Sequence, residues 1–164
     1  ESAIVLSNCN HAIIRTSWVY SNLGENFLLT VLNLSSKNNS IKVVNDQFGS
    51  PTSAKEIANF TLHVVIDYLD KKKYSTNINN IYHFSSDGIT SWYEFAVFIA
   101  RKAVIYGIDI DFREKDIIAI TSKEYKTKAK RPKYPKLDNA FVKEKFGIKI
   151  SHWRYNVEQT IKSL

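Results

Sequence analysis

A stretch of nine residues, 12–20, constrains the fold of this chain more than any other. It opens with Ile13 and Ile14, whose β-branched side chains indicate a buried strand. It closes with a cation, two hydroxyls and two aromatic rings at the expected carboxyl end of that strand: Arg15, Thr16, Ser17, Trp18 and Tyr20. Ligands of open α/β sheets bind at the carboxyl ends of the strands. This stretch therefore predicts a sheet and one wall of a binding site.

Strand-like and helix-like apolar patterns alternate along the rest of the chain. We expect further strands over residues 41–44, 81–84, 108–112 and 117–121, and helices over residues 1–7, 27–34, 53–73, 92–106, 139–146 and 153–164. Two helix starts have the spacing of a capping box, Ser53 with Glu56 and Ser91 with Glu94. The pattern predicts a single α/β domain over residues 1–164, with a small mixed sheet packed against helices.

The composition indicates a globular chain. Its 164 residues, 44% of them hydrophobic, are enough to bury a core. No apolar run approaches the ~20 residues of a membrane span, and no signal peptide is recognised at Glu1. Cys9 is the sole cysteine, which favours a reducing, cytoplasmic setting. The sequence contains no Met, so we expect it to be a piece of a longer protein.

Positive charge is concentrated in residues 123–136. The formal net charge of the chain is +7, and this segment holds seven basic residues against one acid, Glu124. It favours an anionic partner such as a phosphate ester, a nucleotide or a nucleic acid. Arg131, which precedes Pro132, would present a rigid bidentate fork to a diphosphate. A solvated basic loop is the alternative, and interleaved Tyr125 and Tyr134 also permit a nucleic-acid surface.

Several kinds of site are absent from the sequence. The five glycines are too far apart to form a Gly-rich phosphate loop. The four histidines lack the spacing of metal ligands, so no metal is predicted. Tyr68 and Lys72 have the Tyr-x-x-x-Lys spacing of the acid pair of short-chain dehydrogenases, but they lie at a helix end that runs into a lysine cluster. We therefore assign no catalytic residue.

Two interpretations of residues 12–20 stay open from spacing alone. In the first, Trp18 stacks on a sugar or nicotinamide ring, and Thr16 and Ser17 hydrogen-bond to an amide or hydroxyl of a ligand. In the second, Trp18 and Tyr20 are core aromatics and Arg15 belongs to a structural ion pair.

The segment over residues 45–52, NDQFGSPT, also has two interpretations. Asp46 and Gln47 could contact a ligand, with Gly49 allowing a close approach of the backbone. Otherwise the segment is a plain loop that leads into the next helix.

Six motifs occur in an order that points to one family. They are IIRTSWVY, Gly24-x-Asn26-Phe27, VVNDQFGSPTSAKEIA, YHFSSDGITSWYEFA, AKRP followed by LD, and FGI before Trp153. Together they resemble the C-terminal half of the dTDP-4-dehydrorhamnose reductase family, a group of extended short-chain dehydrogenases/reductases, over nearly all 164 residues. The chain departs from the family pattern at Ser21, where Gly is usual, and at Pro135, where Ser is usual.

The resemblance implies a parent enzyme with a Rossmann-like fold, of which this chain is the C-terminal portion. A preceding N-terminal half would bind NADPH through a Gly-rich loop and carry the catalytic Tyr-x-x-x-Lys. Residues 1–20 would be the end of that half, a helix tail plus one strand. The parent would transfer a hydride from NADPH to the C4 ketone of a dTDP-linked 6-deoxy sugar. The product, dTDP-rhamnose, would serve cell-surface polysaccharide synthesis, and this chain alone would be inactive.

The resemblance also implies roles for six residues. The dTDP-sugar would be bound by Trp18, Asn26, Gln47 and Arg131, with Arg131 at the diphosphate. Thr16 and Ser17 would line the nicotinamide end of NADP(H). Two other functions remain as alternatives: a non-catalytic regulatory or binding relative on the same fold, as in the regulatory subunit of methionine adenosyltransferase, and nucleic-acid binding through residues 123–136.

The strand that begins at Ala12 would have an open parallel edge in this chain. We expect the missing half, a second copy of the chain or a rearranged edge to cover it. We also expect Trp18 to be more exposed than in a complete enzyme.

Overall fold

The computed structural model describes residues 1–35, 40–73, 79–111, 113–125 and 136–164, and of residues 71–73 only the backbone. Its helices are α1 (Ser2–Leu6), α2 (Phe27–Ser35), α3 (Ala54–Lys73), α4 (Trp92–Ile105), the 3-10 helix η1 (Glu114–Asp116), α5 (Ala140–Phe146) and α6 (Trp153–Lys162). Its strands are β1 (Ala12–Arg15), β2 (Val19–Tyr20), β3 (Ile41–Val44), β4 (Phe48–Gly49), β5 (Thr52–Ser53), β6 (Asn80–His83), β7 (Thr90–Ser91) and β8 (Ile117–Ile120).

The strands pair two by two. β1 runs parallel to β6, with Ala12 opposite Asn80, and β3 runs parallel to β8, with Ile41 opposite Ile117. The two-residue strands add a parallel pair, β2 with β5, and an antiparallel pair, β4 with β7. The expected α/β class is confirmed, in the form of small separate sheets. Because β1 and β6 are parallel, the residues that follow both strands meet at one end of the pair.

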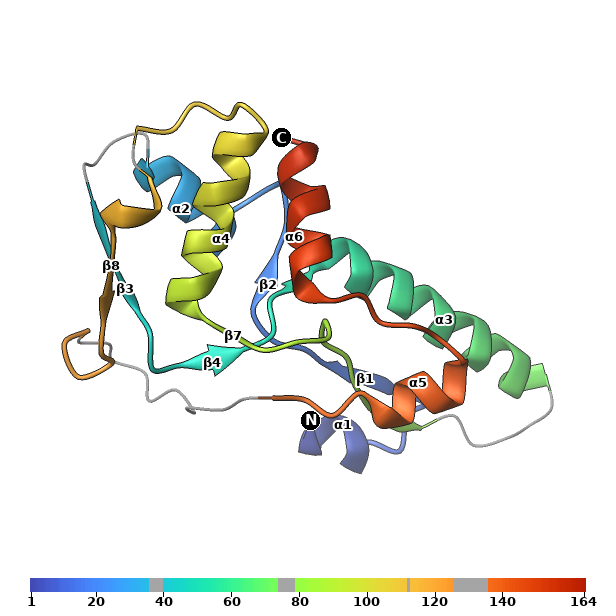
Figure 1. Cartoon of the computed structure of the whole chain (residues 1–164). Coiled ribbons are helices and arrows are strands. Elements are labelled where there is room, and N and C mark those ends of the chain that lie inside the picture. Colours follow the sequence, from blue (N-terminus) through green and yellow to red (C-terminus); the bar gives the residue numbers. More distant parts are fainter. Residues whose placement is uncertain (36–39, 74–78, 112, 126–135) are drawn as a thin grey trace.

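Two apolar clusters hold the elements together. The larger one lies where α2, α4 and α6 pack together beside β3 and β8 (Figure 1), and it includes the fully buried Phe95, Ile99 and Trp153. The smaller one joins α3, β6 and α5 through Phe60, Val64, Tyr82, Phe84 and Val142. The larger cluster contains the apolar positions that helical periodicity assigns to one face of α4, such as Phe95, Ala96 and Ile99. The apolar face that the sequence pattern predicts for α3 is wrong, because Leu62, Val65 and Leu69 are exposed. Phe60 and Val64 of α3 fill the smaller cluster instead.

A polar contact ties the start of α5 to the end of β6. The Asn139 side chain accepts a hydrogen bond from the backbone N–H of Ser85 at 3.1 Å and donates one to its carbonyl oxygen at 2.7 Å. Next to it, Lys143 Nζ lies 2.7 Å from Asp87 Oδ2. Asn139 is buried, so these bonds satisfy backbone groups that water would not reach.

The predicted capping box is present at the start of α4, and the start of α3 is capped differently. Ser91 Oγ accepts from the N–H of Glu94 at 3.1 Å, and the Glu94 carboxylate accepts from the N–H of Ser91 at 3.4 Å, as a capping box requires. Ser53 Oγ instead accepts from the N–H of Lys55, at 3.2 Å. Both serines directly precede a helix of the structure, Ser53 before α3 and Ser91 before α4.

One predicted strand is wrong. Residues 108–111 form neither helix nor strand, and residue 112 lies outside the described part of the chain. Ile110 is nevertheless buried in the larger cluster, and the N–H of Asp111 donates to the carbonyl oxygen of Ser35. The alternating pattern therefore reflects a segment that packs on helices, with no neighbouring strand in the described residues. A smaller correction is that the loop over residues 45–52 contains the two-residue strand β4 and the first residue of β5.

No helix in the described part of the chain has the length and apolar character that crossing a membrane requires. The described residues also contain no group of three histidine, cysteine or acidic side chains that would hold a metal ion.

Replacing Phe60 by alanine is expected to lower the free energy of unfolding by about 3–5 kcal/mol. The ring is 1% exposed and stacks on Phe84 at 4.5 Å. Leu62→Ala, on the same helix but 60% exposed, is the matched control and should cost about 0.5 kcal/mol or less. Urea unfolding followed by circular dichroism measures both, and equal losses would contradict this orientation of α3.

Candidate functional site

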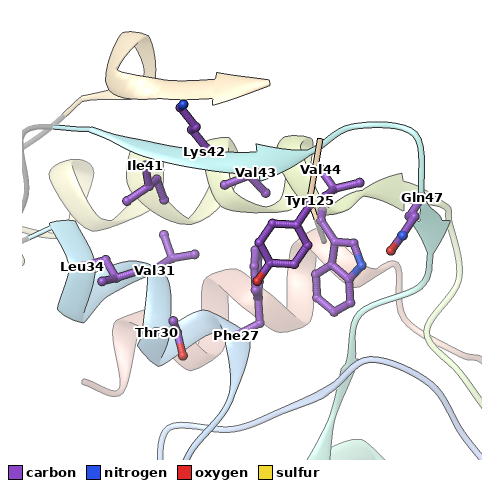
Figure 2. A pocket seen from close by; sticks show the side chains of 11 residues that line it. Phe27, Thr30, Val31, Leu34, Ile41, Lys42, Val43, Val44, Gln47 and Tyr125 are labelled. Carbon is purple, nitrogen blue, oxygen red and sulfur yellow. The ribbon is translucent and has the colours of Figure 1, made fainter. Parts of the chain in front are cut away.

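A cavity of about 410 Å³ lies between α2, β3 and the start of α4. Figure 2 shows Phe27, Tyr125 and Gln47 toward one end of it, and Leu34 and Ile41 toward the other. Its walls are mainly apolar and aromatic, and comprise Phe27, Thr30, Val31, Leu34, Ile41, Lys42, Val43, Val44, Gln47, Trp92 and Tyr125. This volume and composition are typical of small-molecule sites.

Trp92, which lines the cavity, is stacked on a second indole, that of Trp18, which is not among the lining residues. The rings of Trp18 and Trp92 lie 3.5 Å apart with an angle of 11° between their planes, and Phe27 packs on Trp92 at 4.6 Å. Trp18 is half-buried and has φ +47°, a left-handed conformation that non-glycine residues rarely adopt. Trp92 therefore occupies one face of the Trp18 indole, and the predicted contact of Trp18 with a sugar remains a prediction. The expected difference in exposure from a complete enzyme stays a prediction.

Gly49 fits against Trp18. A Cβ atom built on Gly49 would lie 2.4 Å from Trp18 Cε2, well inside van der Waals contact. Glycine is therefore required here by the indole. The close approach proposed for Gly49 from the sequence occurs, with a protein side chain in the place of a ligand. The contact between Gly49 and Trp18 places residues 45–52 against the stacked pair of Trp18 and Trp92.

The predicted substrate residues divide among different environments. Gln47 lines the cavity. Asn26 caps α2, since its Oδ1 accepts from the N–H of Leu29 at 3.2 Å and its Nδ2 donates to the carbonyl oxygen of Ser21 at 3.1 Å. Arg131 lies outside the described residues. The proposed contacts of these three residues with a substrate remain predictions.

Thr16 and Ser17 lie at the shared carboxyl end of β1 and β6. Thr16 Oγ1 is buried and has no hydrogen-bond partner among the described residues. Ser17 Oγ donates to the carbonyl oxygen of Ser50, at a long 3.4 Å. A buried polar group without a partner costs about 1–3 kcal/mol. Thr16 therefore offers an unused donor and acceptor at the strand ends, where ligands of such sheets bind.

Two members of residues 12–20 have structural roles. The Arg15 guanidinium forms an ion pair with Glu1, with Nη2 2.5 Å from Oε2, and the Glu1 carboxylate raises the pKa of Arg15. Tyr20 is buried against Phe95 in the larger cluster, and burial raises the pKa of its phenol well above the usual range. The structural interpretation is confirmed for both residues.

Sequence reasoning missed three walls of the cavity. From the sequence, Phe27 and Trp92 are expected at the starts of two helices, and Tyr125 in the basic segment 123–136. The available signal was position, because Trp92 directly follows the capping residue Ser91 and Phe27 directly follows Asn26. The first residue of a helix lies where binding sites often form. The helical periodicity of the sequence alone assigns Phe27 and Trp92 to the core.

Comparison with known proteins identifies the family. The sequence model described as the RmlD substrate binding domain matches residues 1–164. This chain belongs to the RmlD substrate-binding domain family. The expected resemblance is thereby confirmed.

Relatives and a solved structure agree with this membership. The chain is 31% identical over its whole length to a dTDP-4-dehydrorhamnose reductase of Escherichia coli (strain K12), covering 53% of that protein. It is 37% identical over 94% of its length to the spore coat polysaccharide biosynthesis protein SpsK of Bacillus subtilis (strain 168), covering 48% of that protein. A dTDP-4-dehydrorhamnose reductase structure from Bacillus anthracis str. Ames, in complex with NADP, superimposes with a TM-score of 0.75 at 25% identity, covering 99% of this chain and 51% of that one. This chain thus spans about half the length of these relatives.

Gly49→Ala is expected to displace the Trp18 indole from Trp92, because the added methyl group would overlap the ring. We expect a loss of about 1–3 kcal/mol of stability and a changed near-ultraviolet circular dichroism spectrum from the indoles. Gly107→Ala is the control: φ is +72° there and nothing lies within 4 Å, so it should cost about 1–2 kcal/mol with an unchanged indole signal. An unchanged spectrum in Gly49→Ala would contradict the tight contact.

Proposed function

We propose that this chain is the substrate-binding part of an NADPH-dependent reductase that converts dTDP-4-dehydro-L-rhamnose to dTDP-L-rhamnose. The product would supply cell-surface polysaccharide synthesis. The observation that carries the proposal is the cavity walled by Phe27, Trp92 and Tyr125, in a chain of this family. The single Cys9, which is exposed, fits a reducing compartment, and we propose the cytoplasm.

The cavity suits a nucleobase. A pyrimidine ring has two apolar faces, which the three aromatic rings would cover, and stacking of this kind contributes about 1–3 kcal/mol per base. Its polar edge needs hydrogen-bond partners, and the Gln47 amide supplies both a donor and an acceptor. The diphosphate would then extend toward residues 123–136, where Arg131 would bind it, and the sugar toward Trp18. Asn26 would contact the nucleotide sugar beside the start of α2.

NADP(H) fits the shared end of β1 and β6. The supporting observation is Thr16 Oγ1, which is buried and lacks a partner among the described residues. We propose that Thr16 and Ser17 hold the nicotinamide end of the cofactor by hydrogen bonds. NADPH supplies the hydride when it is bound. Tyr20 is unsuited to donate the proton, because burial raises its pKa, and we assign that step to the N-terminal half.

The N-terminal half would dock on β1. One edge of β1 pairs with β6, and no described strand pairs with its other edge. Beside it, α1 exposes Ile4, Val5 and Leu6, which are 44%, 46% and 80% exposed. An open parallel edge beside apolar side chains is suited to a sheet that continues into a preceding half. A homodimer formed through the same edge is the alternative.

The proposal predicts saturable binding of dTDP to this chain, measured by calorimetry. Trp92→Ala should weaken binding about 10- to 100-fold, because it removes a stacking surface. Arg131→Ala should abolish measurable binding if the guanidinium holds the diphosphate. Tyr155→Ala, an aromatic that is 59% exposed on α6 and outside the cavity lining, should bind like the wild type. The isolated chain should not oxidise NADPH, and no dTDP binding at millimolar concentration would contradict the proposal.

The two alternatives make different predictions. Nucleic-acid binding through residues 123–136 would appear as association with unrelated oligonucleotides that weakens steeply as salt is raised. A regulatory or binding relative would lack the Gly-rich loop or the Tyr-x-x-x-Lys in the preceding half. Salt-insensitive or absent oligonucleotide binding would remove the first, and a preceding half with both motifs would remove the second.

A further inference from the structure

We propose that Asp46 is a positioning residue of the nucleotide site, which holds Tyr125 over the cavity through Ser122. This inference rests on the proposed function of the cavity. It assigns to Asp46 a role that involves no direct contact with the ligand.

The Asp46 carboxylate binds one residue at two points. Its Oδ1 accepts from the backbone N–H of Ser122 at 2.8 Å, and its Oδ2 accepts from Ser122 Oγ at 2.8 Å. The two residues are 76 positions apart in the sequence and both are half-buried. Two short bonds from one carboxylate fix both the distance and the orientation of the segment that begins at Ser122.

That segment carries Tyr125, which needs an anchor. The phenol ring lines the cavity, yet the residue is 53% exposed, so burial alone holds it weakly. The turn before it is closed within itself, since the Glu124 carboxylate accepts from both the N–H and Oγ1 of Thr121 at 2.8 Å. These hydrogen bonds lower the pKa of Glu124. The bonds between Glu124 and Thr121 shape the turn. The bonds between Asp46 and Ser122 attach this turn to the residues that follow β3.

The neighbours of Asp46 contact other elements beside the same cavity. Asn45 donates its N–H to the carbonyl oxygen of Ile120 at 2.9 Å, and its Oδ1 accepts from Ser91 Oγ at 2.8 Å, directly before Trp92. Gln47 faces the cavity. Two consecutive residues, Asn45 and Asp46, therefore connect β8, the start of α4 and the Tyr125 turn. A change at Asp46 would release the turn and leave the other two connections in place.

The experiment is a double-mutant cycle on dTDP binding to this chain, measured by calorimetry. Asp46→Ala and Tyr125→Ala should each weaken binding about 10-fold, since each removes one stacking ring from the cavity. Because Asp46 acts through Tyr125, the double variant should bind like Tyr125→Ala alone. Asp46→Asn should stay within about 3-fold of the wild type, because its amide still accepts from the Ser122 N–H and can donate to Ser122 Oγ. Glu114→Ala, which removes a carboxylate paired with Arg101, is the control and should leave the affinity unchanged.

A second measurement reports on Tyr125 without a ligand. With 3-fluorotyrosine incorporated, the fluorine resonance assigned by Tyr125→Phe should shift and narrow in Asp46→Ala, since the ring becomes more mobile, and should stay in place in Asp46→Asn. Thermal unfolding confirms that each variant folds. If Asp46→Ala fails to fold, Ser122→Ala replaces it in the cycle, with an expected loss of about 3-fold for one of the two bonds.

The outcomes separate this inference from the proposed function. A wild-type chain that does not bind dTDP overturns both. A wild-type chain that binds, with an Asp46→Ala variant that binds equally well or with losses that add up in the double variant, overturns only the role of Asp46. An unchanged Tyr125 fluorine resonance in Asp46→Ala also overturns that role.

Discussion

The stack of Trp18 on Trp92 is the interaction on which the site depends. It joins the turn after β1 to the first residue of α4, and the missing side chain at Gly49 lets residues 45–52 lie against the same ring. Three segments far apart in the sequence therefore meet around one indole. Aromatic pairs of this kind contribute beyond the area that they bury, and their flat geometry fixes orientation as well as distance. Trp92 lines the cavity, and both indoles pack against the larger core cluster.

Apolar packing and polar contacts have different roles in this structure. The clusters around Phe95 and Phe60 hold the helices to the strands. Side-chain hydrogen bonds then place the segments that follow the strands, as Asp46 does for Ser122 and Asn139 does for Ser85. Packing alone would place the Ser122 segment weakly, because Thr121 and residues 123–125 are exposed. The proposed ligand contacts therefore depend on polar groups that do not touch the ligand.

The sequence predicted best what is local. The capping box of Ser91 and Glu94 involves residues three apart, so its spacing determines its geometry, and the helical periodicity located α3 and α4 within a few residues. The strand at 108–112 was predicted wrongly, because alternation reports which side chains are buried and says nothing of whether a neighbouring strand exists. The cavity could not be predicted from spacing, since Phe27, Trp92 and Tyr125 are brought together only by tertiary packing. Asn26 shows a different limit of the sequence. An amide directly before a helix can either cap the helix or contact a ligand, and spacing does not distinguish the two. The structure establishes the cap.

The attachments of Ser122 and Asn139 have a consequence for the order of folding. The Asp46 carboxylate holds Ser122 at the end of β3, and the Asn139 side chain bonds to the backbone of Ser85 after β6. The first contact joins residues 76 positions apart and the second joins residues 54 positions apart. Closing loops of this length costs conformational entropy before any bond forms. Both contacts are therefore expected to form after the strands that they join have come together.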